Sequence, residues 1–231
     1  MGKLATIIGL CGVVVVGLGL AIDSANAAGG TVSGTVKFDG PAPKPKQLNV
    51  SKDKEVCGVK PYFEEDIVVG SDGAIKNAVV VIKDAKGDLK PGDVTFDQNG
   101  CRYLPHVLAL EAGSTVVITN SDGILHNIHT YSKANPAVNM AQPKFKKLIR
   151  QKVDKPEVIK VTCDAHPWMH AWWYVTDTPY FAVTDEKGSF TIKDVPPGNY
   201  TVEVWQEKLG VNDQKVEVKD GQTATANFTM K

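Results

Sequence analysis

Short stretches with the apolar pattern of β-strands, separated by turn residues, recur along almost the whole chain. Near the start, Thr31–Phe38 alternates apolar and polar residues, and Asp39-Gly40-Pro41 then ends the run with turn chemistry. The continuous apolar run Ala78–Ile82 predicts a strand that is buried on both faces. Further strands are predicted at Ser114–Thr119, Val158–Thr162, Tyr174–Thr176, Ser189–Ile192, Tyr200–Trp205 and Gln214–Val218. Many short strands with regular turns predict an all-β fold, with at most a turn or two of helix in Ala141–Val153.

The N-terminal segment has the pattern of a secretory signal. Lys3 provides a short positive region, Leu4–Ile22 is an apolar stretch, and Ala25-Asn26-Ala27 is a cleavage signature of small residues. We therefore expect residues 1–27 to be a signal peptide cleaved near Ala27, and the mature chain to be periplasmic or secreted without a stable membrane span. The alternative is an uncleaved anchor, since the apolar stretch nearly reaches spanning length.

The charge balance restricts the partners of the chain. Lys and Arg together number 26, as do Asp and Glu, and 42% of the residues are hydrophobic. These values exclude a disordered chain and oppose nucleic-acid binding. The basic run Lys144–Lys152 is either a solvated loop or edge strand, or a patch that docks an acidic partner. Pro41–Lys54 is rich in Pro and Lys and predicts an extended surface segment.

The cysteine count becomes informative once the signal is removed. Of the four cysteines, Cys11 lies in the signal, which leaves three in an oxidising compartment. An odd cysteine in an exported protein is a free thiol, an intermolecular bridge or a metal ligand. Only Cys163 has metal-ligand neighbours, so we pair Cys57 with Cys101 as a disulfide that closes a loop of about 45 residues, worth a few kcal/mol.

The residues around Cys163 carry the strongest functional pattern. His166 and Met169 follow Cys163 at intervals of three in CDAHPWMHA, and His126 follows an apolar strand and the turn Asn120–Gly123. Two imidazoles and a thiolate in a plane, with a thioether as weak axial ligand, define a blue-copper site. The sequence therefore predicts one type 1 copper ion held by His126, Cys163, His166 and Met169.

Three other histidines lie close to this pattern in the sequence. His129 is three residues from His126, so on a strand the two side chains point to opposite faces. His106 shares strand parity with Leu108 and Leu110, which favours a partly buried structural histidine. We expect His170, beside Met169, to project to the surface. His106 and His129 remain candidates for additional metal contacts.

Two stretches resemble the cupredoxins. YLPHVLALEAGSTVVITNSDGILHNIH is similar to the first half of a small cupredoxin of the amicyanin and plastocyanin type, and CDAHPWMHAWWYV is similar to the second half. The resemblance covers about Val94–Thr178 and implies a Greek-key sandwich. It also implies that His126, Cys163 and His166 are equatorial ligands, that Met169 is axial, and that Asn127 braces the cysteine loop.

The flanking regions resemble a carboxypeptidase regulatory-like, or transthyretin-like, β-sandwich. TVSGTVKFDGPAP and NAVVVIKDAKG precede the copper stretch, and FAVTDEKGSFTIKDVPPGNYTVEVW follows it. This implies a sandwich divided between residues 28–93 and 179–231, with the copper module inserted at 94–178. The combination also resembles exported bacterial proteins of the methylamine-utilisation type.

We therefore expect a one-electron carrier whose redox partner docks near His166 and Trp168 or on the run Lys144–Lys152. In the cupredoxins the electron leaves through an exposed edge of the second histidine, here His166. One alternative is copper storage or delivery, which the additional histidines favour. Another is a cell-surface interaction sandwich with a structural metal. We expect no enzyme, since the sequence has no Ser/His/Asp arrangement and no phosphate-binding glycine loop.

Overall fold

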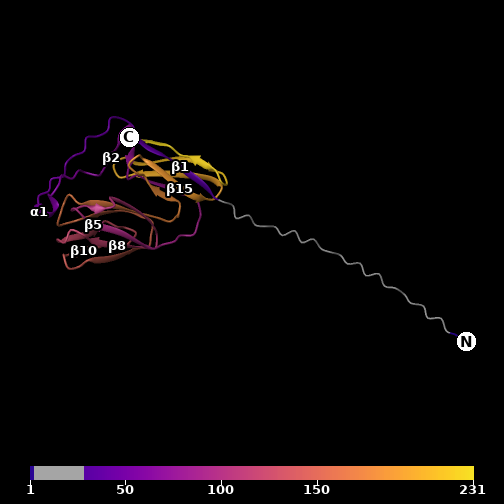
Figure 1. The fold of residues 1–231 in the computed structure, drawn as a ribbon, viewed down its shortest axis with the longest axis horizontal. Helices are drawn as coiled ribbons and strands as arrows, with labels where there is room; N and C mark the ends of the chain where they lie inside the picture. Colours follow the sequence, from indigo (N-terminus) through magenta and orange to yellow (C-terminus); the bar gives the residue numbers. More distant parts are fainter. Residues whose placement is uncertain (3–28) are drawn as a thin grey trace.

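The computed structural model describes residues 1–2 and 29–231. The predicted signal peptide and Cys11 therefore lie outside the described residues, apart from Met1 and Gly2. Figure 1 shows two layered β-structures side by side, one containing β5, β8 and β10 and the other containing β1 and β15. The all-β prediction is confirmed. No helix in the described part of the chain is long and apolar enough to cross a membrane.

The first sandwich packs a five-stranded sheet on a four-stranded one. The five-stranded sheet has the order β10 (Asn139–Gln142), β9 (His126–Thr130), β12 (Glu157–Thr162), β13 (His170–Thr176) and β7 (Val107–Glu111). The four-stranded sheet has the order β11 (Leu148–Val153), β8 (Ser114–Asn120), β5 (Asp93–Gln98) and β6 (Tyr103–Leu104). Within it, β5 pairs with β8 in parallel, and β13 pairs with β7 in parallel in the other sheet.

Alternating residues of both sheets fill the core of this sandwich, as expected when one face of each strand is buried. Strand β8 shows this clearly, because Val116 and Ile118 are fully buried and their neighbours are half-buried. Phe96 stacks on Tyr103 and meets Trp173 edge to face, with ring centroids 5.0 and 5.4 Å apart. Cys163 and Met169 belong to the same buried cluster.

The second sandwich also has two sheets. Strand β1 (Gly30–Phe38) lies between β15 (Ser189–Val195) and β18 (Thr223–Thr225), and it also pairs with β19 (Phe228–Met230). The facing sheet has the order β14 (Phe181–Val183), β4 (Val79–Ile82), β16 (Gly198–Gln206) and β17 (Gly210–Val218). Short elements complete the fold, namely α1 (Lys54–Cys57), β2 (Val68–Val69), the 3₁₀ turn η1 (Ser71–Gly73) and β3 (Ile75–Lys76).

The turn before β15 shows how one sequence motif builds this second sandwich. Asp185 Oδ1 accepts hydrogen bonds from the backbone N–H groups of Lys187 and Ser189 at 2.8 and 2.9 Å. Gly188 has φ of +66°, and its carbonyl accepts the N–H of Val36 in β1. A side chain at this glycine would be strained by the positive φ and would lie 2.5 Å from the Val36 oxygen. The motif thus fixes the start of β15 against β1.

Strand β4 joins the cores of the two sandwiches. All four of its residues are buried, as the continuous apolar run predicted. Val80 and Ile82 face the core of the second sandwich, whereas Val79 and Val81 pack with Val107 and Tyr174 of the first. A small apolar cluster of these four residues therefore lies between the two cores.

The prediction of a turn or two of helix in Ala141–Val153 is wrong. Its ends lie in strands β10 and β11, which pair antiparallel with β9 and β8. The basic run forms a loop and then the edge strand β11, where exposed residues alternate with buried Ile149 and Val153. Cross-strand pairing decides this structure, and helix propensity alone does not reveal it.

Candidate metal centre

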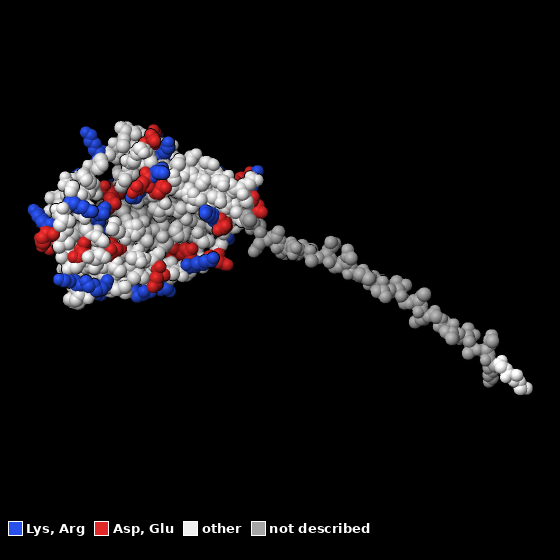
Figure 2. Space-filling view, viewed as in Figure 1, with Lys and Arg blue, Asp and Glu red and all other residues white. Residues whose placement is uncertain are grey.

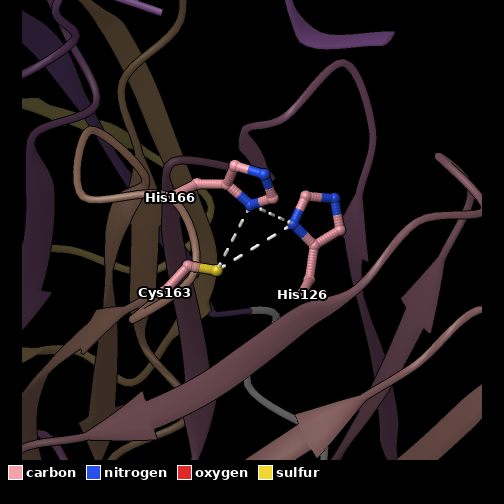
Figure 3. A group of neighbouring side chains, drawn as sticks. All are labelled: His126, Cys163 and His166. Carbon is pink, nitrogen blue, oxygen red and sulfur yellow. Dashed lines mark hydrogen bonds between the residues drawn. The ribbon is translucent and has the colours of Figure 1, made fainter. Parts of the chain in front are cut away.

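Three predicted ligands converge at one end of the first sandwich. His126 begins β9, while Cys163 and His166 lie in the loop that joins β12 to β13. His126 Nδ1 and His166 Nδ1 are 2.9 Å apart, and Cys163 Sγ lies 3.9 and 3.7 Å from them (Figure 3). Both histidines are 0% exposed and Cys163 is 2% exposed. A thiol and two imidazole nitrogens therefore face one another in a site shielded from water.

The loop that carries Cys163 and His166 is closed by its own backbone. The N–H of Cys163 donates to the carbonyl of Met169 at 3.2 Å, and the N–H of Met169 donates to the carbonyl of His166 at 2.9 Å. Asn127 Oδ1 accepts the N–H of Asp164 from the neighbouring strand end. The structure thus places Asn127 as a brace between the His126 strand and the cysteine loop, in the position that the cupredoxin resemblance implies.

A carboxylate holds the outer nitrogen of each histidine. Asp122 Oδ2 lies 2.9 Å from His126 Nε2, and Asp53 Oδ2 lies 2.9 Å from His166 Nε2. A histidine that donates its Nε2 proton to a carboxylate presents Nδ1 as a lone pair, and metal-ligating histidines are commonly oriented in this way. Asp122 is itself fixed, because it accepts the backbone N–H groups of Gly100 and Cys101 at 2.6 and 2.8 Å.

The pKa values of the two histidines move in opposite directions. Burial by itself lowers the pKa of His126, but Asp122 and the sulfur of Cys163 outweigh it and raise the pKa to about 9. Burial lowers the pKa of His166, and the neighbouring His126 lowers it further against the opposing effect of Asp53. The two histidines therefore differ in their affinity for a proton, and a metal ion bound by both would compete with protonation of His126.

The surroundings of Cys163 lower the pKa of its thiol. Burial raises its pKa, but His126 and the backbone N–H groups of Asn127 and His166 outweigh that effect and lower the pKa below its ordinary value. The thiolate is the form that binds metals. The local hydrogen bonds therefore favour the charged donor that a metal requires.

The donor triangle has the size of a coordination plane. Metal–nitrogen and metal–sulfur bonds of about 2.0–2.3 Å predict separations of about 3.5–3.8 Å between donors in a trigonal plane. The sulfur–nitrogen distances of 3.9 and 3.7 Å agree with this, and the nitrogen–nitrogen distance of 2.9 Å is shorter by about half an ångström. The three residues fit one transition-metal ion if the two imidazoles move slightly apart when it binds.

Met169, the predicted axial ligand, is 2% exposed and packs in the core cluster that contains Cys163. Its backbone closes the ligand loop, as described above. The Met169 side chain is therefore buried in the core of the first sandwich, next to Cys163. Its axial role remains a prediction.

The other candidate histidines lie outside the donor triangle. His129 is on the opposite face of β9 and contacts Asp164 at 3.0 Å on the surface. His106 is buried and lies in a separate cluster with His170 and Glu207. His170 is only 22% exposed, which differs from the surface position expected from the sequence, because Asp66 and Glu207 pack against it.

The expected exposed edge of His166 is not at the surface. Asp53 covers its Nε2, and the Trp168 ring lies 5.1 Å from the imidazole. Trp168 Nε1 donates to the carbonyl of Cys101, whose sulfur forms the predicted disulfide with Cys57. Figure 1 shows the covering segment, which leaves β1, passes α1 beside the first sandwich and returns to β2.

Sequence reasoning predicted the three side chains that converge here and missed both carboxylates. Asp122 had a signal, because it lies four residues before His126 in the turn that precedes the strand. Asp53 had none, because it is 113 residues from His166 and belongs to the segment Pro41–Lys54 that was predicted only as extended surface. Its position depends on how that segment crosses the first sandwich.

Comparisons with known proteins find one family model and several solved structures that are similar to parts of the chain. Residues 174–231 match the family described as carboxypeptidase regulatory-like domain. Among solved structures, the chain is similar to the purple cupredoxin from Nitrosopumilus maritimus, with 22% identity over 36% of this chain and 100% of that one, at a TM-score of 0.32. It is similar to a Cu(I) form of an amicyanin variant, with 17% identity over 43% of this chain and 99% of that one, at a TM-score of 0.34.

A third similar structure is the copper-containing nitrite reductase from Thermus scotoductus SA-01, with 23% identity over 42% of this chain and a TM-score of 0.33. The chain spans only 25% of that enzyme's length. No curated protein matches the chain. The matched segment 174–231 contains the Asp185 turn and the Pro196-Pro197-Gly198 turn, the motifs on which the resemblance to a carboxypeptidase regulatory-like sandwich rests.

Proposed function

We propose that the chain is an exported type 1 copper protein that carries one electron at a time. The observation that carries the proposal is the buried convergence of His126 Nδ1, His166 Nδ1 and Cys163 Sγ within 4 Å of one another. Thiolate and thioether donors suit Cu(I), whereas imidazole also suits Cu(II). When bound, copper would supply the redox couple.

The residues of the chain supply rigidity and isolation from water. His126 is on a strand, and the Asp122 carboxylate fixes the plane of its ring. The backbone bonds of the Cys163–Met169 loop fix the other donors. Because each donor is held before the metal binds, a change of metal charge requires little rearrangement, which is what a carrier needs. The burial of the three donor side chains opposes rapid exchange of the metal ion, which favours a carrier over a delivery protein.

The docking surface that we propose for the redox partner is a basic apolar patch formed by Leu125, Lys144, Phe145, Lys146 and Lys147. Leu125 is 52% exposed and Phe145 is 84% exposed. Gln142 pairs with His126 and Leu148 pairs with Thr119, so the basic loop between them lies at the same end of the sandwich as the metal centre. Figure 2 shows Lys and Arg side chains along the margin near β10 and β8 of Figure 1.

An absorption spectrum of the full mature chain loaded with Cu(II) tests the proposed function. We expect an intense visible band from charge transfer between the thiolate and copper, its loss in Cys163→Ser, and its retention in the control His129→Gln. A reversible one-electron wave in voltammetry should accompany the band. Absence of the band from the copper-loaded chain, or an unchanged band in Cys163→Ser, would sink the proposal.

A further inference from the structure

A second cluster of metal-binding side chains lies where the two sandwiches meet. His106 precedes β7 and His170 begins β13, so both belong to the first sandwich. Glu207 directly follows β16 of the second sandwich, and Asp66 precedes β2. The candidate donor atoms of His106, His170 and Glu207 all lie within 4.8 Å of one another. None of these four residues contributes to the donor triangle of the first centre.

The two imidazoles converge on the same carboxylate. His106 Nε2 contacts Glu207 Oε1, and His170 Nε2 lies 3.8 Å from Glu207 Oε2 and 2.8 Å from Asp66 Oδ1. The two rings are 5.2 Å apart and nearly perpendicular. Each ring therefore directs a nitrogen toward a common region between two carboxylates.

The surrounding side chains hold the carboxylates in place. Trp172 Nε1 donates to Glu207 Oε2 at 2.6 Å, and Lys208 Nζ lies 2.8 Å from Asp66 Oδ2. The other oxygen of Asp66 is buried and lies 2.8 Å from His170 Nε2 without a hydrogen bond between them. A cation held by both atoms would satisfy this oxygen.

The deeper half of this cluster is almost fully buried. The side chains of His106 and Glu207 are 4% and 5% exposed. A buried carboxylate requires hydrogen-bonding or charged partners, and Glu207 is surrounded by the imidazoles of His106 and His170 and the indole of Trp172. One divalent ion held between the imidazoles and the two carboxylates would neutralise the charge of the carboxylates.

We propose that His106, His170, Glu207 and Asp66 bind a divalent transition-metal ion, preferentially Zn²⁺, that joins the two sandwiches. Two imidazoles and two carboxylates form the nitrogen and oxygen donor set that Zn²⁺ accepts in tetrahedral geometry. The cluster has no sulfur donor, in contrast to the first centre, so it lacks the thiolate that holds Cu(I). The two centres are thereby chemically distinct.

The site also has a route for the ion. A surface hollow of about 430 Å³ has Asp66 and His170 in its wall, together with Glu64 and Trp168. Asp66 and His170 are 19% and 22% exposed in their side chains, whereas His106 and Glu207 lie deeper. An ion would enter at the first pair and complete its coordination at the second. Because its ligands come from both sandwiches, it would stabilise their association.

Zinc binding by the full mature chain in a Cys163→Ser background tests the site, because this change removes the thiolate of the first centre. Titration calorimetry should show a Zn²⁺ event that is weakened by more than about 100-fold in His170→Gln and in Glu207→Gln, beyond the loss typical of an outer-sphere partner. The control His129→Gln, a histidine that also contacts a carboxylate, should leave the event unchanged. Zn²⁺ should also raise the unfolding temperature in the control and not in the two ligand variants.

Crystals of the same protein grown with Zn²⁺ give a direct reading through anomalous scattering at the zinc edge. A peak between His106, His170 and Glu207 would support the site. The proposal is overturned if the peak appears only between His126 and His166, or if the chain binds no Zn²⁺. It is equally overturned if binding persists unchanged in both ligand variants. None of these outcomes depends on the visible spectrum of the copper protein, so the two proposals succeed or fail separately.

Discussion

At the scale of single residues, the two carboxylates beside the metal centre differ in how firmly they are held. Asp122 is 6% exposed in its side chain and accepts two backbone N–H groups, whereas the Asp53 side chain is 44% exposed. Both lie 2.9 Å from a histidine Nε2. Although the two distances are equal, Asp53 is less firmly held than Asp122, because an exposed carboxylate has water as an alternative partner.

This difference predicts the effects of Asp122→Asn and Asp53→Asn on copper affinity. We expect Asp122→Asn to weaken binding by about 10–100-fold, because His126 loses the partner that orients its ring. Asp53→Asn, the matched control at the other histidine, should weaken binding less. Competition with a chelator of known affinity at fixed pH measures both. Equal losses in the two variants would contradict the idea that restraint of the carboxylate decides its effect.

At the scale of elements, a buried amide and a carboxylate fasten two connections near β12, the strand leading to Cys163. These are the loop between β9 and β10 and the turn between β11 and β12. Asn135 is 6% exposed and accepts the N–H groups of Asp154 and Lys155 at 2.8 and 2.9 Å. Glu157, the first residue of β12, accepts the backbone N–H and the side-chain amide of Asn135, each at 3.1 Å, and contacts the N–H of Lys133. Glu157 thus fastens the loop between β9 and β10 to the strand, and Asn135 joins that loop to the turn before β12.

Glu157→Gln should make the stability of the protein depend less on pH. Burial raises the pKa of Glu157, but the backbone and amide donors together outweigh it and lower the pKa below its ordinary value of 4.5. A carboxylate whose pKa is lowered on folding stabilises the folded state above its unfolded pKa, and this stabilisation disappears as the pH falls through the lower folded value. We expect a loss of about 1–2 kcal/mol at pH 7, typical of hydrogen bonds to a charged group.

Urea unfolding of the full mature chain at neutral pH and at about pH 3 measures this difference between the wild type and Glu157→Gln. The gap should shrink at the acidic pH, since the wild-type carboxylate takes up a proton as the pH falls through its lowered pKa. Glu186→Gln serves as the control, because Glu186 is 85% exposed and pairs only with Lys76 at the surface. A gap that stays constant with pH would show that the charge of Glu157 does not contribute.

At the scale of the whole molecule, the segment between β1 and β2 connects the two sandwiches across the metal centre. It supplies Asp53 to His166, and the Cys57–Cys101 disulfide, with a sequence separation of 44, fastens it to the first sandwich. Trp168 packs between His166 and the carbonyl of Cys101. The second histidine is therefore covered, and the basic apolar patch lies at the same end of the sandwich beside His126 and offers exposed apolar and basic side chains to a partner.

If the chain binds copper as proposed, the patch predicts how it reacts with small charged redox reagents. In the triple variant Lys144→Glu, Lys146→Glu and Lys147→Glu, oxidation of the reduced protein by anionic hexacyanoferrate should slow by at least about tenfold at low salt, because local charge steers the reagent. The effect should fade at high salt. Stopped-flow measurement follows the rate, and a cationic cobalt complex should show the opposite change.

A charge-matched variant in the second sandwich, with Lys215, Lys219 and Lys231 each changed to Glu, controls for net charge. It carries the same alteration of total charge at residues of β17 or beyond it. If this variant slows hexacyanoferrate as much as the patch variant does, the patch is not the route of electron exchange.

Local sequence patterns were enough to predict many of the strands and the three side chains that converge at the first centre. Cys163, His166 and Met169 lie within seven residues, and turn residues place His126 at the start of a strand. The disulfide followed from counting cysteines after removal of the signal, and the structure contains it. These features are determined over short distances in the chain, where residue type and spacing restrict the geometry directly.

The sequence by itself determined an all-β chain with a cysteine and histidine metal pattern and a regulatory-like domain at its C-terminal end. Only the tertiary structure decided that His166 is covered by Asp53, and that His106 meets Glu207 from 101 residues away. The physical reason is that a contact between distant residues depends on how sheets pack and where a connecting segment crosses them. Pairing and burial of the whole chain set those positions, and no local pattern encodes them.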